Sequence, residues 1–260
     1  MSINLVASTN QDENIVDVTL IKSGTAAGFD IAKIKTRRTV RSNFLNNLLK
    51  KEDVVYLFKE EQEFFNFVPG GSKGHQYLNE QTIEANRLQS YRDAAEKELS
   101  EWIRFSGNDA EKYMDGLTTA SMEIGGLSGF VVRNFYNKNS VMKKDFRDKN
   151  IENVIMQVSQ SAGWLLISSK DESVTTLLET GKRMQRLFLK VRDKSIAIHP
   201  MTQILEEPST KQTVNQSIGI SDNIQFILRV GYLKSYPVPV SLRRPVDWFV
   251  RAKNHSTTKL

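Results

Sequence analysis

Residues 34–44 read Ile-Lys-Thr-Arg-Arg-Thr-Val-Arg-Ser-Asn-Phe, so that Arg37, Arg38 and Arg41 stand within one short stretch. On a helix, Arg37 and Arg41 would be four residues apart on one face, from which both can reach a single dianionic group. The planar guanidinium fork matches a phosphate, and each charge-assisted hydrogen bond contributes about 1.5–3 kcal/mol. By itself the stretch is weak evidence for a phosphate site, because short basic runs are common on solvated surfaces.

A second basic pair, Arg243-Arg244, lies far away in the sequence. It falls in an extended segment, because Pro237, Pro239 and Pro245 exclude regular secondary structure there. If the fold brings the two arginine clusters together, they can hold one phosphate between them. The two clusters are therefore a candidate phosphate site in two parts, and the alternative is that they are solvated surface arginines or arginines at helix ends that pair with nearby acids.

The composition is that of an ordinary globular protein, with 39% hydrophobic and 25% charged residues among 260. Because there is no cysteine, disulfides, thiolate metal sites and a cysteine nucleophile are excluded. The three histidines, His75, His199 and His255, have no metal-ligand spacing, so we expect no metal site. The polar start of the chain does not resemble a secretory signal, and no apolar run reaches the roughly 20 residues of a membrane span. These features favour a cytoplasmic location.

The first part of the chain predicts a disordered lead over residues 1–14 and a half-buried strand over Ile15–Lys22, which Gly24–Gly28 interrupt. A short helix is expected over Asp30–Arg38, and another from about Glu52. One domain is expected over residues 15–252, with a flexible tail at 253–260.

Apolar residues recur at three- and four-residue steps over Glu80–Phe105, which predicts one long helix with Trp102 in the core. The pattern weakens over residues 106–150, which we interpret as an irregular insertion or lid. Its basic run, Lys143–Lys149, is expected to be a solvated loop or the edge of that lid.

The continuous apolar run Ala162–Ser168 predicts a central strand that contains Trp164, and Ile224–Tyr232 predicts another strand. Between them, Asp171–Arg192 has an apolar stripe typical of a long helix, with Ser169 and Glu172 as a candidate capping box. Gly181 falls on this stripe and predicts that a helix or ligand approaches the backbone closely. After a helical turn near Met201–Leu205 we expect a polar segment.

No Ser-His-Asp order, paired-carboxylate signature, Walker loop or GxGxxG motif occurs, so hydrolase and P-loop functions have no support. His199, in the sequence His-Pro-Met, is expected to be packed or to cap a turn rather than to act as an acid. The sequence predicts no catalytic residue.

The stretch 34–44 resembles the RRSxRxF opening of the FMN-dependent nitroreductases. Further motifs follow in the order seen in the two-halved, Acg-like branch of that family: Glu98–Arg104 with Asp115-Gly116, Gly181–Leu189, His199–Gln203 with Glu206, and Leu228–Tyr232 with Arg243–Pro245. The resemblance covers about residues 15–250.

This resemblance implies an α+β nitroreductase-like fold, in which a mostly antiparallel sheet is flanked by helices around a long central helix. It implies that Arg37, Arg38, Thr39, Arg41, Gly181, Arg243 and Arg244 bind FMN. The implied reaction passes hydride from NAD(P)H through the flavin to a nitro compound, a quinone or a similar small-molecule acceptor.

One departure concerns the PSxxNxQPW-type loop by which the opposing half of such proteins contacts the flavin, since nothing like it occurs here. The chain therefore resembles an Acg-like protein that lacks most of its N-terminal half, and a homodimer or a complementary half would restore the site. A non-catalytic protein that stores flavin or regulates is the alternative function. The net charge of +6 also permits a nucleic-acid-binding module, but no aromatic residues alternate with the arginines, so no nucleic-acid partner is expected.

Overall fold

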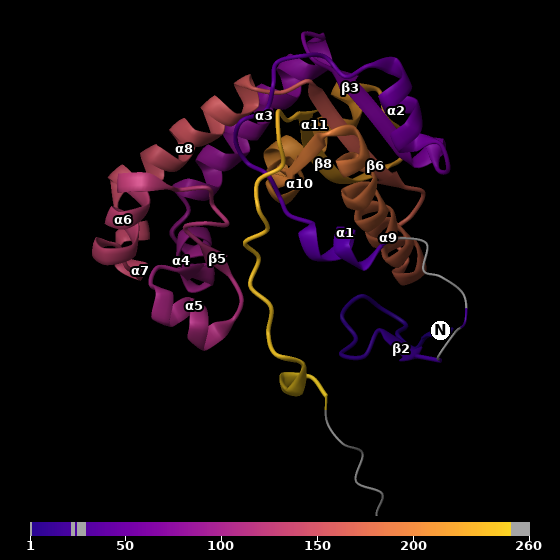
Figure 1. Cartoon of the computed structure of the whole chain (residues 1–260). Helices are drawn as coiled ribbons and strands as arrows, with labels where there is room; N and C mark the ends of the chain where they lie inside the picture. The colour runs from indigo at the N-terminus through magenta and orange to yellow at the C-terminus, as the bar shows by residue number, and fades with distance from the viewer. Residues whose placement is uncertain (1, 22–23, 25–29, 251–260) are drawn as a thin grey trace, which may run out of the picture. The chain divides into compact units, whose positions relative to one another are not determined.

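A computed structural model describes residues 2–21, 24 and 30–250 (Figure 1). The chain forms two units: unit 1 comprises residues 1–92 and 144–239, and unit 2 comprises residues 93–143 with the chain from 240 onward. The division passes close to the predicted insertion at 106–150, but unit 2 begins earlier, at residue 93.

The centre of unit 1 is a four-stranded sheet in which every neighbouring pair is antiparallel, with the order β3-β6-β8-β7. Its strands are β3 (Phe65–Pro69), β6 (Gly163–Ser169), β7 (Ile196–Pro200) and β8 (Asn223–Tyr232). The predictions of strands at 162–168 and 224–232 are confirmed. All of β6 is buried, which explains why its sequence is continuously apolar rather than alternating.

Helices cover both faces of this sheet. On β6, Leu165 and Ile167 pack in one cluster with helices α2 (Lys51–Phe58) and α9 (Val174–Lys190). The alternate residues Trp164 and Leu166 pack on the opposite face, as expected for a strand. The helices on that face are α3 (Lys73–Ser90), α8 (Lys144–Ser159), α10 (Gln203–Glu206) and α11 (Pro208–Ile218). Trp164 is fully buried, as predicted.

Helix α9 is the long helix predicted over 171–192, and it continues into the 3-10 turn η2 (Val191–Lys194). The predicted capping box of Ser169 and Glu172 is wrong, because Ser169 is still part of β6. The N-cap is Ser173, whose Oγ accepts a hydrogen bond from the backbone N–H of Thr176 at 3.4 Å.

Two further predictions for unit 1 need correction. Residues 1–14, expected to be a disordered lead, contain strand β1 (Ser2–Leu5), which pairs with β2 (Val16–Thr19). The strand predicted at 15–22 is therefore shorter; Lys22 and most of Gly24–Gly28 lie outside the described residues. The polar segment expected after residue 205 contains helix α11, which begins at Pro208 and ends at Ile218, and Gly219 caps it in the left-handed conformation.

The single helix predicted over 80–105 is wrong, because α3 ends at Ser90 and α4 (Asp93–Trp102) begins three residues later. The break is held in unit 1 by side-chain contacts that the apolar pattern does not reveal. Tyr91 donates to Asp148, and Arg92 forms an ion pair of 2.8 Å with Glu207.

Unit 2 consists of short helices and one pair of short parallel strands. Its elements are α4, β4 (Ile103–Arg104), α5 (Gly107–Tyr113), β5 (Leu117–Thr118), α6 (Gly126–Phe135), α7 (Lys138–Val141) and the 3-10 turn η3 (Val246–Trp248). Trp102 is 52% exposed, so its predicted place in the core is wrong.

Residues 106–150 are thus largely helical rather than irregular. Local caps explain helices that a weak apolar pattern does not predict: Ser106 with Asp109, and Asn137 with Ser140, form capping boxes. The basic run Lys143–Lys149 is mostly the first turns of α8, supported by an ion pair between Lys144 and Asp148. In the part of the chain that is described, no helix combines the length and apolar character needed to cross a bilayer.

Candidate functional site

The arginine-rich segment is extended rather than helical. Helix α1 (Ile31–Thr36) is capped by Asp30 and ends at Thr36, and the φ of −61° and ψ of 132° of the next residue, Arg37, are those of extended backbone. The prediction that Arg37 and Arg41 are helical neighbours is therefore wrong. Burial instead alternates: Arg38 and Val40 are buried, whereas Arg37, Thr39 and Arg41 are half-buried. Such a two-residue period is typical of extended chain.

Contacts with other parts of unit 1 hold this segment in place. Arg38 donates to the backbone carbonyl of Val238 at 2.6 Å, so the buried guanidinium joins two parts of the chain. Arg192 donates to the carbonyl of Thr36 at 2.9 Å. The guanidinium of Arg37 lies 4.8 Å from the centre of the Phe188 ring, close enough for a cation–π contact. Arg38 thus contributes to the architecture of the segment, while Arg37 rests on helix α9.

Arg229, in the middle of β8, is fully buried and contacts the same segment. Its guanidinium donates to the backbone carbonyl of Arg41 at 2.6 Å and to those of Gln157 and Gln160. The Phe44 ring lies 4.2 Å from its central carbon. Our sequence interpretation missed this residue, although a lone charge inside an otherwise apolar strand signals a buried cation that needs polar partners.

Phe44 packs over two small residues of the sheet. Ala197 on β7 pairs directly with Gly231 on β8, and Phe44 packs against both. A Cβ at Gly231 would lie 3.0 Å from Cδ2 of Phe44, so there is no room for a side chain there without movement of the ring. The next residue of the segment, Leu45, donates its backbone N–H to the carbonyl of Tyr232 at 2.8 Å.

His199 lies beside Arg229, its partner in the β7–β8 register, with Nδ1 3.4 Å from Nη2. Burial, together with the charges of Arg229 and Arg41, lowers the pKa of His199 well below its usual value of 6.5. The imidazole is therefore neutral near pH 7 and packed, as the sequence predicts.

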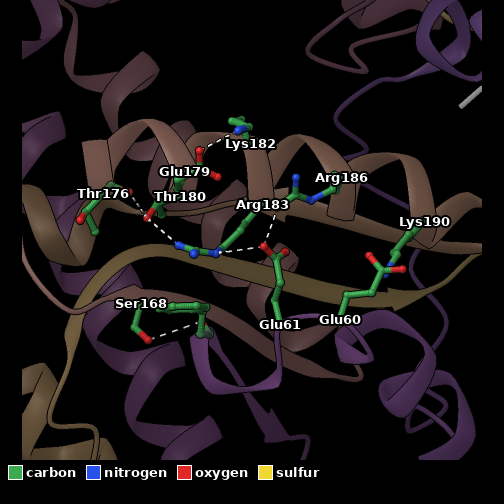
Figure 2. A network of polar contacts seen from close by, with 11 residues as sticks. Glu60, Glu61, Ser168, Thr176, Glu179, Thr180, Lys182, Arg183, Arg186 and Lys190 are labelled. Atoms are coloured by element: carbon green, nitrogen blue, oxygen red, sulfur yellow. Dashed lines mark hydrogen bonds and ion pairs between the residues drawn. The ribbon is translucent and has the colours of Figure 1, made fainter. Parts of the chain in front are cut away.

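Two arginines of helix α9, Arg183 and Arg186, point toward Glu61 (Figure 2). Glu61, between α2 and η1 (Gln62–Phe64), accepts from Arg183 at 3.3 Å and from Arg186 at 2.6 Å. The Arg183 guanidinium also stacks 3.5 Å from the centre of the Phe64 ring.

Gly181 lies two residues before Arg183 on α9 and is exposed. A Cβ at this position would meet no atom of the described chain within 4 Å. The predictions that Gly181 belongs to the apolar stripe and is closely approached are therefore wrong within this chain, and its contact with a cofactor stays a prediction.

Arg243 and Arg244 belong to unit 2, whereas Arg37, Arg38 and Arg41 belong to unit 1. Arg243 is exposed and donates to the adjacent carbonyl of Leu242 at 3.0 Å. Arg244 forms an ion pair with Asp115. A meeting of the two basic clusters around one phosphate stays a prediction.

Asp115 also binds Arg104, at 2.5 Å, and this pair explains the Trp-x-Arg and Asp-Gly motifs of the sequence. Gly116 has a φ of +76°, and a Cβ there would lie 2.4 Å from the carbonyl oxygen of Trp102 and 3.0 Å from the Arg104 guanidinium. Arg104, Asp115 and Gly116, which belong to the motifs Glu98–Arg104 and Asp115-Gly116, thus hold β4 beside β5 within unit 2. Among the described residues, no group of three His, Asp or Glu side chains is arranged to hold a metal ion.

No family model and no curated protein matches this sequence. Among the solved structures that resemble the chain are two with a TM-score of 0.51 each. The FMN-dependent nitroreductase NfnB from Mycobacterium smegmatis, in complex with NADPH, is 15% identical, and the match covers 85% of this chain and 96% of that one. The FMN- and NADPH-dependent nitroreductase NfnB from a Sphingopyxis strain is 12% identical, with 85% and 97% covered.

The chain has the nitroreductase fold. The predicted fold class is thereby confirmed, including the antiparallel sheet, the flanking helices and the long helix α9. At this level of identity the likeness concerns the fold alone. Membership of the Acg-like branch and the loss of an N-terminal half stay predictions.

Proposed function

We propose that this chain is an FMN-dependent oxidoreductase of nitroreductase type. The observation that carries the proposal is segment 37–41, in which the half-buried Arg37, Thr39 and Arg41 alternate with the buried Arg38 and Val40. Two guanidiniums and a hydroxyl are a donor set suited to a phosphate ester. The nitroreductase fold supports the choice of ligand, because both NfnB structures are described as FMN-dependent.

Within the proposal, Arg37, Thr39 and Arg41 hold the phosphate of FMN. Arg243 and Arg244 would add charge to the same phosphate, with Arg244 partly neutralised by Asp115. Arg38 acts through the backbone that it anchors. Bound FMN supplies hydride chemistry between NAD(P)H and a nitro, quinone or similar acceptor, and the protein supplies binding and orientation.

A cytoplasmic location and pairing, either with a second copy or with a complementary half, belong to the same proposal. Pairing would provide the flavin contacts that the PSxxNxQPW-type loop makes in the family that the sequence resembles.

The proposal is tested by the absorbance spectrum of the purified chain, with and without added FMN. We expect flavin bands that stay with the protein through gel filtration, and oxidation of NADPH or NADH when a nitro compound or a quinone is added. A chain that retains no flavin even after addition of FMN would contradict the proposal. Retained flavin without oxidation of either nicotinamide would favour the alternative, a flavin-storage or regulatory protein.

A further inference from the structure

Arg229 occupies a position that is costly for a cation. It is fully buried in the middle strand β8, where a charge must be compensated by well-oriented polar groups. Backbone carbonyls near the end of α8, at Gln157 and Gln160, accept hydrogen bonds from it. The same guanidinium also holds the carbonyl of Arg41, 188 residues away in the sequence. One buried side chain therefore joins helix α8, the sheet and the arginine-rich segment.

The arginine-rich segment depends on such contacts for its position. Regular structure ends with α1 at Thr36 and resumes with α2 at Lys51, so no helix or ladder of strand hydrogen bonds fixes residues 37–50. The carbonyl of Arg41 is held by Arg229, and the Phe44 ring rests on both Arg229 and Gly231. Because alternate residues of a strand point to the same face, Arg229 and Gly231 form one continuous surface on which Phe44 rests, and we call this surface the seat.

We propose that Arg229 is a positioning residue, which together with Gly231 seats residues 41–44 and thereby sets the affinity for the phosphate of the flavin. This inference rests on the proposed function. The hydrogen bond from Arg229 fixes the carbonyl of Arg41 and, because the peptide group is planar, the whole peptide group that follows Arg41. This peptide group begins at the Arg41 Cα, from which the Arg41 side chain extends. Without it, the segment must be ordered when the phosphate binds, and that ordering lowers the affinity.

The test compares two flavins that differ only by the phosphate, FMN and riboflavin, on the variants Arg229→Met and Gly231→Ala. We expect Arg229→Met to weaken FMN binding about tenfold, and Gly231→Ala to weaken it several-fold, while both change riboflavin binding less than about twofold. General damage to the fold would weaken both ligands alike. Gly231→Ala adds one methyl group to a strand, so it keeps the test available if Arg229→Met does not fold.

Arg183→Met is the matched control. Arg183 is also a buried arginine of unit 1 that stacks on an aromatic ring, but its partners are Glu61 and Phe64 rather than the arginine-rich segment. This variant should leave the ratio of the two affinities unchanged. A similar shift of the ratio in the control would overturn the assignment to Arg229.

Hydrogen exchange of the flavin-free protein provides a readout that needs no ligand. The amide of Leu45, which donates to the carbonyl of Tyr232, should exchange faster in both seat variants than in the wild type. If wild-type protein binds FMN but the variants bind it equally well, or lose both flavins together, the inference fails while the proposed function stands. If the wild type binds no flavin, the proposed function fails, and unchanged exchange at Leu45 would then reject the seat as well.

Discussion

Arg104 donates two hydrogen bonds to one carboxylate oxygen of Asp115, from Nη2 at 2.5 Å and from Nε at 3.1 Å. Arg104 is only 8% exposed, so its buried positive charge needs this carboxylate as a counter-charge. Arg244 reaches the other oxygen of the same carboxylate. The Asp-Gly motif of the sequence thus has a structural role in unit 2, whatever the unit binds.

Replacement of Asp115 by asparagine should destabilise the protein by about 3 kcal/mol, because it leaves the cation of Arg104 buried without its counter-charge. Urea unfolding measures the loss. Glu101→Gln is the control, since Glu101 pairs with Lys138 where both side chains are more than half exposed, and such surface pairs contribute about 1 kcal/mol or less. Equal losses in the two variants would contradict the buried-pair interpretation.

The same variant predicts a change in acid stability. Hydrogen bonds from Arg104 and Arg244 hold the pKa of Asp115 below its usual value of 3.8, against an opposing effect of burial. Between that lowered pKa and about 3.9, the unfolded chain binds more protons, so stability falls as the pH falls. Asp115→Asn should flatten this part of the stability curve. An unchanged slope between about pH 4 and pH 2 would show that the carboxylate is not held in this way.

Gly116→Ala should cost at least about 2 kcal/mol. An alanine there would adopt a left-handed backbone, and its Cβ would collide with the carbonyl oxygen of Trp102. Gly107→Ala is the control, because a Cβ at Gly107 would meet no atom of the described residues within 4 Å, and this change should be neutral or stabilise by up to about 1 kcal/mol. Thermal unfolding of the two variants distinguishes the effects, and similar melting temperatures would argue against the tight turn at Gly116.

Simultaneous replacement of Arg37 and Arg41 by alanine should weaken FMN retention at least tenfold, since two charge-assisted hydrogen bonds to the phosphate would be lost. Binding of riboflavin should hardly change. Lys35→Ala removes a nearby exposed cation from α1 and serves as the control, with an expected change below about twofold. Unchanged FMN retention in the double variant would count against the phosphate site.

His199 should make the protein less stable in mild acid. Because burial lowers its pKa, the unfolded chain takes up a proton first, and stability falls as the pH drops below about 6.5. His199→Gln should remove this slope, measured as the urea midpoint between about pH 7 and pH 5. His75, which is less buried and whose pKa is also lowered by burial, offers a comparison, and its replacement should remove less of the slope. A steeper slope in His199→Gln would refute the neutral, packed state.

The fold could be predicted where the sequence pattern and the tertiary packing agree. The continuous apolar run of β6 predicts a strand covered on both faces, and β6 lies between two layers of helices. The apolar stripe of α9 predicts a helix with one buried side, and that side packs against the sheet. The prediction failed where side-chain partners distant in sequence decide the structure. The apolar residues keep their helical spacing beyond Tyr91. The break between α3 and α4 is nevertheless held by the hydrogen bond from Tyr91 to Asp148 and by the ion pair between Arg92 and Glu207.

The candidate site shows the same division. Sequence reasoning found the arginines of segment 37–41 but assigned them a helical spacing, because a short basic stretch carries no apolar pattern that distinguishes helix from extended chain. It also missed Arg229, whose role depends on the carbonyl of Arg41 and on the Phe44 ring. Those partners become visible only when strand β8 and the arginine-rich segment are placed side by side.

Because Phe44 contacts Gly231, substitutions at these two positions should be coupled in evolution. Wherever an aromatic ring is kept at position 44 in related chains, position 231 should remain glycine. A larger residue at 231 should appear only together with a smaller one at 44. Covariation between these two sites would then trace the contact through chains too divergent for their motifs to be recognised.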